Sequence, residues 1–109
     1  MKEIKAYIRK IKVEETVHAL EKIGVMDMTI LDVMEVGRQA DPKSLKLSIE
    51  IAEKYAKVAK LEIVCSDDKV PQIIKTLREA AYTGSPGDGI IYVTAVEEAI
   101  KIRTGQKQV

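Results

Sequence analysis

The sequence is poor in aromatic, cysteine and histidine residues. Its 109 residues include no tryptophan, no phenylalanine, one cysteine and one histidine. The core must therefore be aliphatic, for which there is ample material because 46% of the residues are hydrophobic. Cys65 alone cannot form an internal disulfide, which suits a reducing compartment. No group of Cys and His residues has the spacing of a metal site, so we expect no metal centre.

Charge of one sign and long apolar runs are also absent. The 18 basic and 17 acidic residues give a formal net charge of +1, so no global field favours nucleic acid or an anionic membrane. The first residues carry charges throughout, unlike a signal peptide, and no apolar run approaches membrane-spanning length. We expect a cytoplasmic protein with a single domain over residues 1–109.

Two stretches, residues 2–36 and residues 60–96, share one pattern of elements. Each predicts a strand with alternating apolar residues, an amphipathic helix and a second strand. The expected strands are 4–8, 28–36, 61–65 and 90–95, and the expected helices are 13–23 and 67–81. A doubled β-α-β pattern is typical of a ferredoxin-like fold of the α+β class.

The helix boundaries have local signals. Asp67 or Asp68 can cap the second helix, Pro71 fits its first turn, and Gly24 ends the first helix. The long strands are also expected to leave one apolar sheet face that assembly covers. Between the two halves, residues 39–59 include a strictly alternating segment, 45–51. This insertion is either an extended β-arm or a loop that contacts a partner, and its length favours the second interpretation.

Two segments could bind an anion. The loop Thr83-Gly-Ser-Pro-Gly-Asp-Gly89 can adopt positive φ and turn successive N–H groups towards a phosphate. It is neither a P-loop nor a dinucleotide fingerprint, and the alternative is an ordinary helix-to-strand connection. Lys101 and Arg103 alternate in an extended segment near the end of the chain, where a solvated tail is the alternative. No set of residues forms a catalytic constellation.

Taken together, four motifs resemble those of the PII signal-transduction (nitrogen regulatory protein P-II) family. They are Gly37-Arg-Gln39, Lys60-Leu-Glu-Ile-Val64, the loop 83–89, and Val96-Glu-Glu-Ala-Ile-Lys-Ile-Arg-Thr-Gly105. The resemblance implies a ferredoxin-like βαββαβ subunit that assembles as a homotrimer. It also implies a non-catalytic regulator that binds ATP or ADP, or AMP, in clefts between subunits, with magnesium accompanying ATP. Residues 39–59 would be the effector T-loop, which docks on a transporter, enzyme or regulator.

The resemblance also implies the residues of the nucleotide site. Glu62 and Thr29 would serve the adenosine part, and Gln39 would help to hold magnesium and 2-oxoglutarate. Residues 83–89 would be the B-loop that wraps the phosphates, and residues 101–105 the C-loop that reaches in from the neighbouring subunit. The full implied set is Thr29, Gly37, Arg38, Gln39, Glu62, Val64, Thr83, Gly84, Gly87, Asp88, Gly89, Lys101 and Arg103.

This sequence departs from the family pattern at four positions. Ile90 replaces a phosphate-binding lysine, so we expect ATP to lose more affinity than ADP or AMP. Val58 replaces the lysine that pairs with 2-oxoglutarate, so we expect that acid not to bind. Lys101 replaces an arginine, and Ile51 replaces a tyrosine that is nucleotidylated in many members. Alternatives are a PII-like sensor of AMP, ADP or a cyclic nucleotide linked to bicarbonate or other transport, or a trimeric metal-tolerance module.

Overall fold

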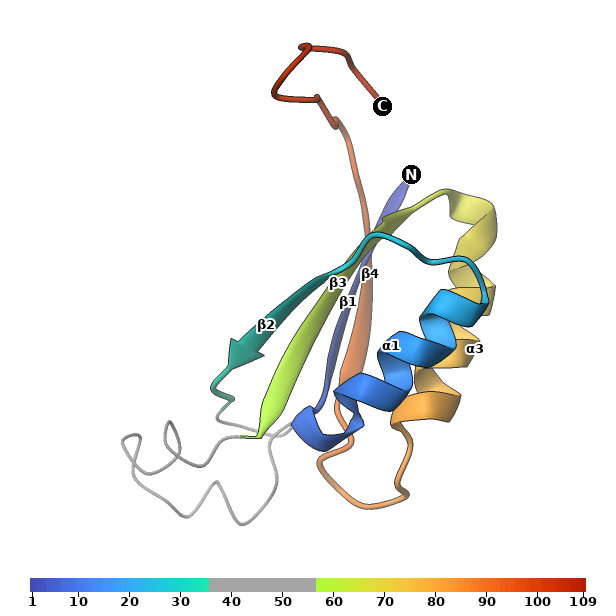
Figure 1. Cartoon of the computed structure of the whole chain (residues 1–109), viewed down its shortest axis with the longest axis vertical. Helices are drawn as coiled ribbons and strands as arrows, with labels where there is room; N and C mark the ends of the chain where they lie inside the picture. The colour runs from blue at the N-terminus through green and yellow to red at the C-terminus, as the bar shows by residue number, and fades with distance from the viewer. Residues whose placement is uncertain (36–56) are drawn as a thin grey trace.

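The computed structural model describes residues 1–35 and 57–109. The expected strand at 45–51 and the positions 37–39 and 51 lie outside these residues. The elements in chain order are β1 (Lys2–Arg9), a 3₁₀ turn (Lys10–Lys12), α1 (Val13–Lys22), β2 (Thr29–Val33), β3 (Val58–Cys65), a second 3₁₀ turn (Asp67–Lys69), α3 (Val70–Ala81) and β4 (Ile90–Ala95) (Figure 1). This order confirms the expected βαββαβ pattern.

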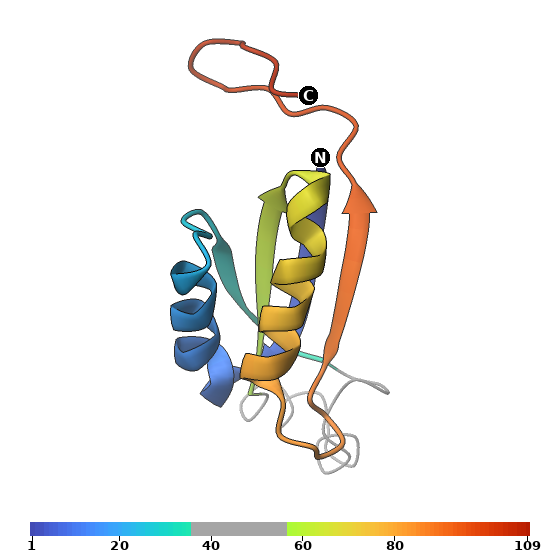
Figure 2. The same cartoon turned by 90° about the vertical axis from the view of Figure 1, so that its right-hand side faces the viewer.

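The strands form one antiparallel sheet in the order β2-β3-β1-β4. The two central strands, β1 and β3, come from the starts of the two halves of the chain, as in a ferredoxin-like fold. Both helices cover the same face of the sheet (Figure 2). The other face is open in the single chain.

The core lies between the sheet and the helices. Burial alternates along β1 and β3, so that every second side chain of these strands points to the helices. These side chains meet the apolar faces of α1 and α3, which is how an aliphatic sequence closes a core. The buried apolar residues are Ile4, Ala6, Ile8, Leu20, Ala59, Leu61, Ile63, Ile73, Leu77 and Ala81.

Several element boundaries differ from expectation: β1 and β3 are longer than 4–8 and 61–65, and β3 begins at Val58, within the segment 39–59 that was expected to be an insertion. The second strand ends at Val33 rather than at 36, and the α-helix of the second half begins at Val70 after a 3₁₀ turn. The expected aspartate cap is wrong for this helix, since its N-cap position, Lys69, has no side-chain cap hydrogen bond. Asp67 is instead engaged by the N-terminal ammonium group of Met1, at 2.8 Å.

The open face of the sheet is partly apolar, as strand alternation predicts, with Leu31 39% and Val64 51% exposed, but it is more polar than expected. Its central strands carry charged side chains that pair along one strand, Lys5 with Glu3 at 3.5 Å and Lys60 with Glu62 at 3.0 Å. Tyr7 packs edge-on against the Tyr92 ring, with 6.1 Å between ring centroids. A partner for this face must therefore complement polar and aromatic groups as well as apolar ones.

Candidate functional site

The loop between α3 and β4 lies at the end of the sheet where β1 finishes (Figures 1 and 2). Three of its glycines have positive φ: Gly84 at 86°, Gly87 at 99° and Gly89 at 109°. Residues with side chains rarely adopt this conformation. The glycine-rich sequence is thus explained by a chain that must reverse direction tightly between helix and strand.

Asp88 organises this loop from within. Its Oδ2 accepts hydrogen bonds from the backbone N–H of Thr83 at 2.8 Å and of Gly84 at 2.9 Å. Its Oδ1 accepts one from the Thr83 hydroxyl. The start and the end of the loop are therefore tied together by a single carboxylate.

The same carboxylate meets a charge from outside the loop. Arg9, the last residue of β1, donates its Nε–H to Asp88 Oδ1 at 3.1 Å. Its Nη2 group donates to the carbonyl oxygen of Pro86 at 2.7 Å. No local motif marks the role of Arg9, because its contacts join residues 79 and 77 positions apart in the sequence.

These contacts change the acidity of Asp88. Desolvation by itself raises the pKa of this carboxyl, but the hydrogen bonds from Thr83, Arg9 and Gly84 outweigh it. The pKa of Asp88 in the folded protein is therefore held well below its ordinary value of 3.8. Because folding lowers the pKa, the carboxylate stabilises the fold above pH 3.8, and this contribution is lost as the pH falls towards the lower folded-state pKa.

Asp88→Asn is expected to lower the free energy of unfolding by about 1–2 kcal/mol at neutral pH, because a neutral amide accepts these hydrogen bonds more weakly. The difference from wild type should shrink below pH 3.8, where the wild-type carboxylate loses its advantage. Urea denaturation across pH 2–7 measures both effects.

The control is Asp32→Asn, which removes a pair with Lys10 at 3.1 Å whose aspartate side chain is 76% exposed. An exposed pair of this kind contributes less than about 1 kcal/mol. Equal losses in the two variants would show that Asp88 does not organise the loop.

Three residues of the implied nucleotide site lie together on the open face. Thr29 on β2 is opposite Glu62 on β3, and Val64 follows on the same face. Val64 is 51% exposed, so it offers an apolar surface to a ligand or to another chain. Glu62 is paired with Lys60 at 3.0 Å in this structure. These three positions belong to β2 and β3, whereas the loop 83–89 connects α3 to β4.

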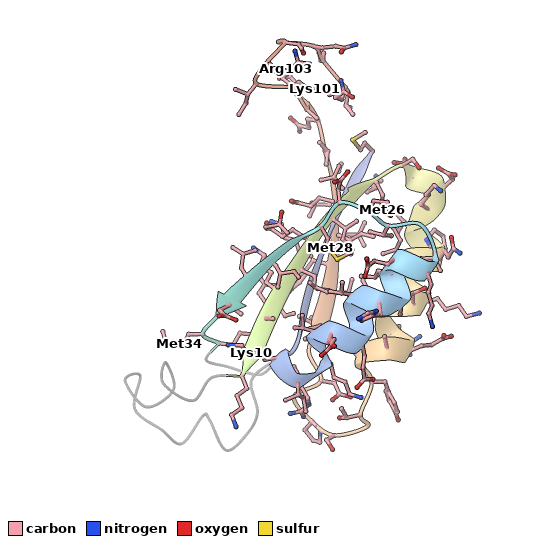
Figure 3. The ribbon with its side chains drawn as sticks, in the orientation of Figure 1. Lys10, Met26, Met28, Met34, Lys101 and Arg103 are labelled. Carbon is pink, nitrogen blue, oxygen red and sulfur yellow. The ribbon has the colours of Figure 1, made fainter. Side chains whose placement is uncertain are left out.

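The C-terminal segment lies far from the loop. Beyond β4 the chain forms a small hairpin, in which Lys101 N–H donates to the carbonyl oxygen of Gln106 at 2.9 Å. Figure 3 places Lys101 and Arg103 on this hairpin, at the end of the molecule opposite to Lys10 and the loop. The six residues of β4 alone span about 20 Å at ordinary strand rise. Within one chain, the two predicted parts of the phosphate site do not meet.

A separate apolar groove of about 400 Å³ runs between α3 and β4 on the helix side of the sheet. The groove is lined by Asp88 and Gly89 and also by Leu77 and Tyr82. It therefore lies on the opposite side of the sheet from Glu62. We do not assign the nucleotide to it, since the predicted adenosine residues lie on the open face.

Within residues 1–35 and 57–109, no helix has the length and apolar character needed to cross a membrane. The same residues contain no group of three or more His, Cys, Asp or Glu side chains placed to hold a metal ion. The sole histidine, His18, is exposed on α1.

Fold and site define a ferredoxin-like subunit with an ordered glycine-rich loop and a projecting basic arm. The family model for the nitrogen regulatory protein P-II matches residues 1–106. The chain is 37% identical over 107 residues to the protein of that name from Azospirillum brasilense, covering 98% of this chain and 96% of the relative. It is 40% identical to the Bradyrhizobium diazoefficiens protein over 106 residues, covering 97% and 95%. The chain therefore belongs to the P-II family, whose members are non-catalytic signal-transduction regulators.

A solved structure agrees with this assignment. The PII protein of Arabidopsis thaliana, determined with citrate bound, superposes with a TM-score of 0.75 at 31% sequence identity. The match covers 97% of this chain and 83% of that one. The ferredoxin-like fold and the family resemblance inferred from the sequence are both confirmed.

Proposed function

We propose that this regulator binds ATP or ADP in a cleft formed by the loop 83–89 of one copy and the segment 101–105 of the next copy in a homotrimer. The observation that carries the proposal is that these two parts lie at opposite ends of one chain. A glycine-rich loop and basic side chains are each suited to bind phosphate, so they would serve one site only if they came from different copies. A closed ring of copies brings unlike surfaces together at every interface.

The proposed roles come from the family resemblance, and the position of each described residue supports them. Thr29, Glu62 and Val64 face the adenosine from the open sheet face. The backbone of Gly84, Gly87 and Gly89 shapes the wall for the phosphates, while Thr83 and Asp88 hold that wall in place. Lys101 and Arg103 supply positive charge from the neighbouring copy. Gly37, Arg38 and Gln39 complete the proposed set and lie outside the described residues.

Magnesium belongs to this proposal only as a companion of ATP. Mg²⁺ commonly keeps several waters and binds through phosphate oxygens with few protein ligands. The described residues have no acidic cluster of their own, which fits such a shared site better than a protein-built one. Gln39 would be the protein contact on the metal side.

Ile90 decides which nucleotide the site favours. This residue pairs with Tyr7 across β1 and β4, immediately after the loop, and it is uncharged. A site with one cation fewer loses most for the ligand with the most phosphate charge. We therefore propose that ADP or AMP competes with ATP more effectively than in members with a lysine at this position.

The signal passes to a protein partner through residues 39–59 in this proposal, and 2-oxoglutarate does not take part. Val58 lies on the open face beside Lys60, two residues along β3. Lys60 is held by Glu62 at 3.0 Å and lies over the Tyr7 ring, 5.7 Å from its centroid. It is thus not available for the carboxylate that the missing lysine would bind. An unpaired carboxylate beside Val58 carries a desolvation cost.

Calorimetric titration with ATP, ADP, AMP and cyclic AMP, each with and without magnesium and 2-oxoglutarate, tests the proposed ligand. We expect saturable binding of ADP at least as tight as that of ATP, and no heat from 2-oxoglutarate. Ile90→Lys should improve ATP binding selectively. Absence of binding for every adenine nucleotide would refute the proposed function, and micromolar binding of 2-oxoglutarate would refute the argument from Val58.

Assembly is tested separately. Size-exclusion chromatography with light scattering should give about three times the chain mass of 12.1 kDa at micromolar concentration. A monomer would remove the second copy from the cleft. It would therefore contradict the two-copy site, whatever the calorimetry shows.

A further inference from the structure

Arg9 reaches from the core of the sheet to the outer loop. It is the last residue of β1, a central strand fixed by β3 on one side and β4 on the other. From there it contacts two points of the loop, the Asp88 carboxylate at 3.1 Å and the Pro86 carbonyl oxygen at 2.7 Å. A central strand of the sheet is thereby connected to the loop that is proposed to hold phosphate.

The chemistry of the contact requires an arginine. Its planar guanidinium carries donors in a fixed fork, so one side chain can bind a carboxylate and a carbonyl oxygen in two directions at once. A lysine at the same place would bring equal charge on a single nitrogen without the fixed geometry. With lysine at position 9, either the Pro86 carbonyl oxygen would lose its hydrogen-bond donor or the Asp88 carboxylate would lose its charged partner.

The surroundings favour positioning over ligand binding. The Arg9 side chain is 20% exposed and that of Asp88 is 25% exposed, and opposite charges at this distance largely cancel each other towards an approaching anion. Arg9 contacts the later part of the loop, at Pro86 and Asp88, whereas Thr83 and Gly84 lie at its start. Both parts of the loop are thus bonded to the Asp88 carboxylate. Arg9 thus fixes the loop relative to the sheet, while Asp88 fixes it within itself.

We infer that Arg9 is a positioning residue that holds the loop 83–89 in the conformation that binds phosphate. The inference rests on the function proposed for this loop. A loop held in its bound conformation binds more tightly because less freedom is lost on binding. Release of the tie should therefore cost affinity, even though the guanidinium is not a phosphate ligand.

The test compares Arg9→Lys with Arg78→Lys as the matched control. Arg78 is exposed on α3 near the loop, and no hydrogen bond from it to the loop is present among the described residues. Backbone amide exchange is followed by NMR in the nucleotide-free protein, and ADP affinity is measured by calorimetry. In Arg9→Lys we expect the Thr83 and Gly84 amides to exchange roughly 10-fold faster and ADP to bind roughly 10-fold more weakly.

Amides in β1 and β3 provide the readout that separates positioning from general destabilisation. Their exchange should stay as in wild type in both variants, and Arg78→Lys should leave both loop exchange and affinity unchanged. Unchanged loop exchange or unchanged ADP affinity in Arg9→Lys overturns the inference while the function stands. A wild-type protein that binds no adenine nucleotide overturns the function, and with it the role of Arg9 in binding.

Discussion

Gly89→Ala is expected to lower the free energy of unfolding by about 3 kcal/mol or more, or to prevent folding. A Cβ atom built at this position lies 1.7 Å from the carbonyl oxygen of Tyr7 and 2.8 Å from its carbonyl carbon. Both atoms belong to the backbone of β1, which cannot move aside because it is a central strand of the sheet. The φ of 109° adds strain of its own.

Gly24→Ala is the control, because it isolates the cost of positive φ from the cost of the clash. Gly24 has a φ of 93°, but a Cβ there meets no atom within 4 Å. Its substitution should cost about 1 kcal/mol. Urea denaturation followed by far-UV circular dichroism measures both variants. Losses of similar size would show that the close approach of the loop to β1 is not a constraint.

The second large effect is expected at the other half of the site. Arg103→Ala should weaken ADP binding by roughly 10-fold or more, the range for a charge-assisted hydrogen bond to phosphate. Lys101→Ala should have a smaller effect, since a flexible point charge is more easily replaced by water and salt. Calorimetry on both variants gives the comparison directly.

Lys107→Ala is the control within the same arm. It removes an exposed pair with Glu98 at 3.4 Å, and a change near zero is expected because such pairs contribute little. If Arg103→Ala and Lys101→Ala also leave affinity unchanged, the arm is a solvated tail. The proposed cleft would then lack its second wall.

Periodicity was enough to predict the sheet and its helices. The alternation of Ile4, Ala6 and Ile8 marks a half-buried strand in any context, and the helical spacing around Ile73 and Leu77 marks a buried helix face. The ends of elements were harder to predict. Asp67 lies where a cap is expected, yet the N-terminal ammonium group, distant in sequence, competes for it.

Only part of the site could be predicted from the sequence. The positive φ values of the loop could be predicted from its local sequence, because they occur at the glycines 84, 87 and 89. Arg9 shows no such signal, because its role depends on a contact with Asp88 that only the folded sheet creates. The open face is more polar than predicted for a related reason. Alternation fixes which side chains share a face, but charge pairs such as Lys60 with Glu62 decide how polar that face is.

The resemblance to the P-II family located residues that physical reasoning left ambiguous. Lys101 and Arg103 on their own could be a solvated tail, and the structure leaves both exposed on a projecting hairpin. Because this hairpin lies far from the loop 83–89, the two can serve one nucleotide only if they come from different copies. The claim, as proposed above, is that the nucleotide site forms where two copies of the chain meet.

Subunit mixing tests this claim most directly. Asp88→Asn damages the loop and Arg103→Ala damages the arm, and ADP is titrated at a concentration where neither variant alone binds. If each cleft takes its loop from one copy and its arm from the next, trimers reassembled from an equal mixture should recover about a quarter of the wild-type number of sites. Mixed trimers that recover no binding would contradict the account, because they would show that loop and arm act within the same chain or not at all.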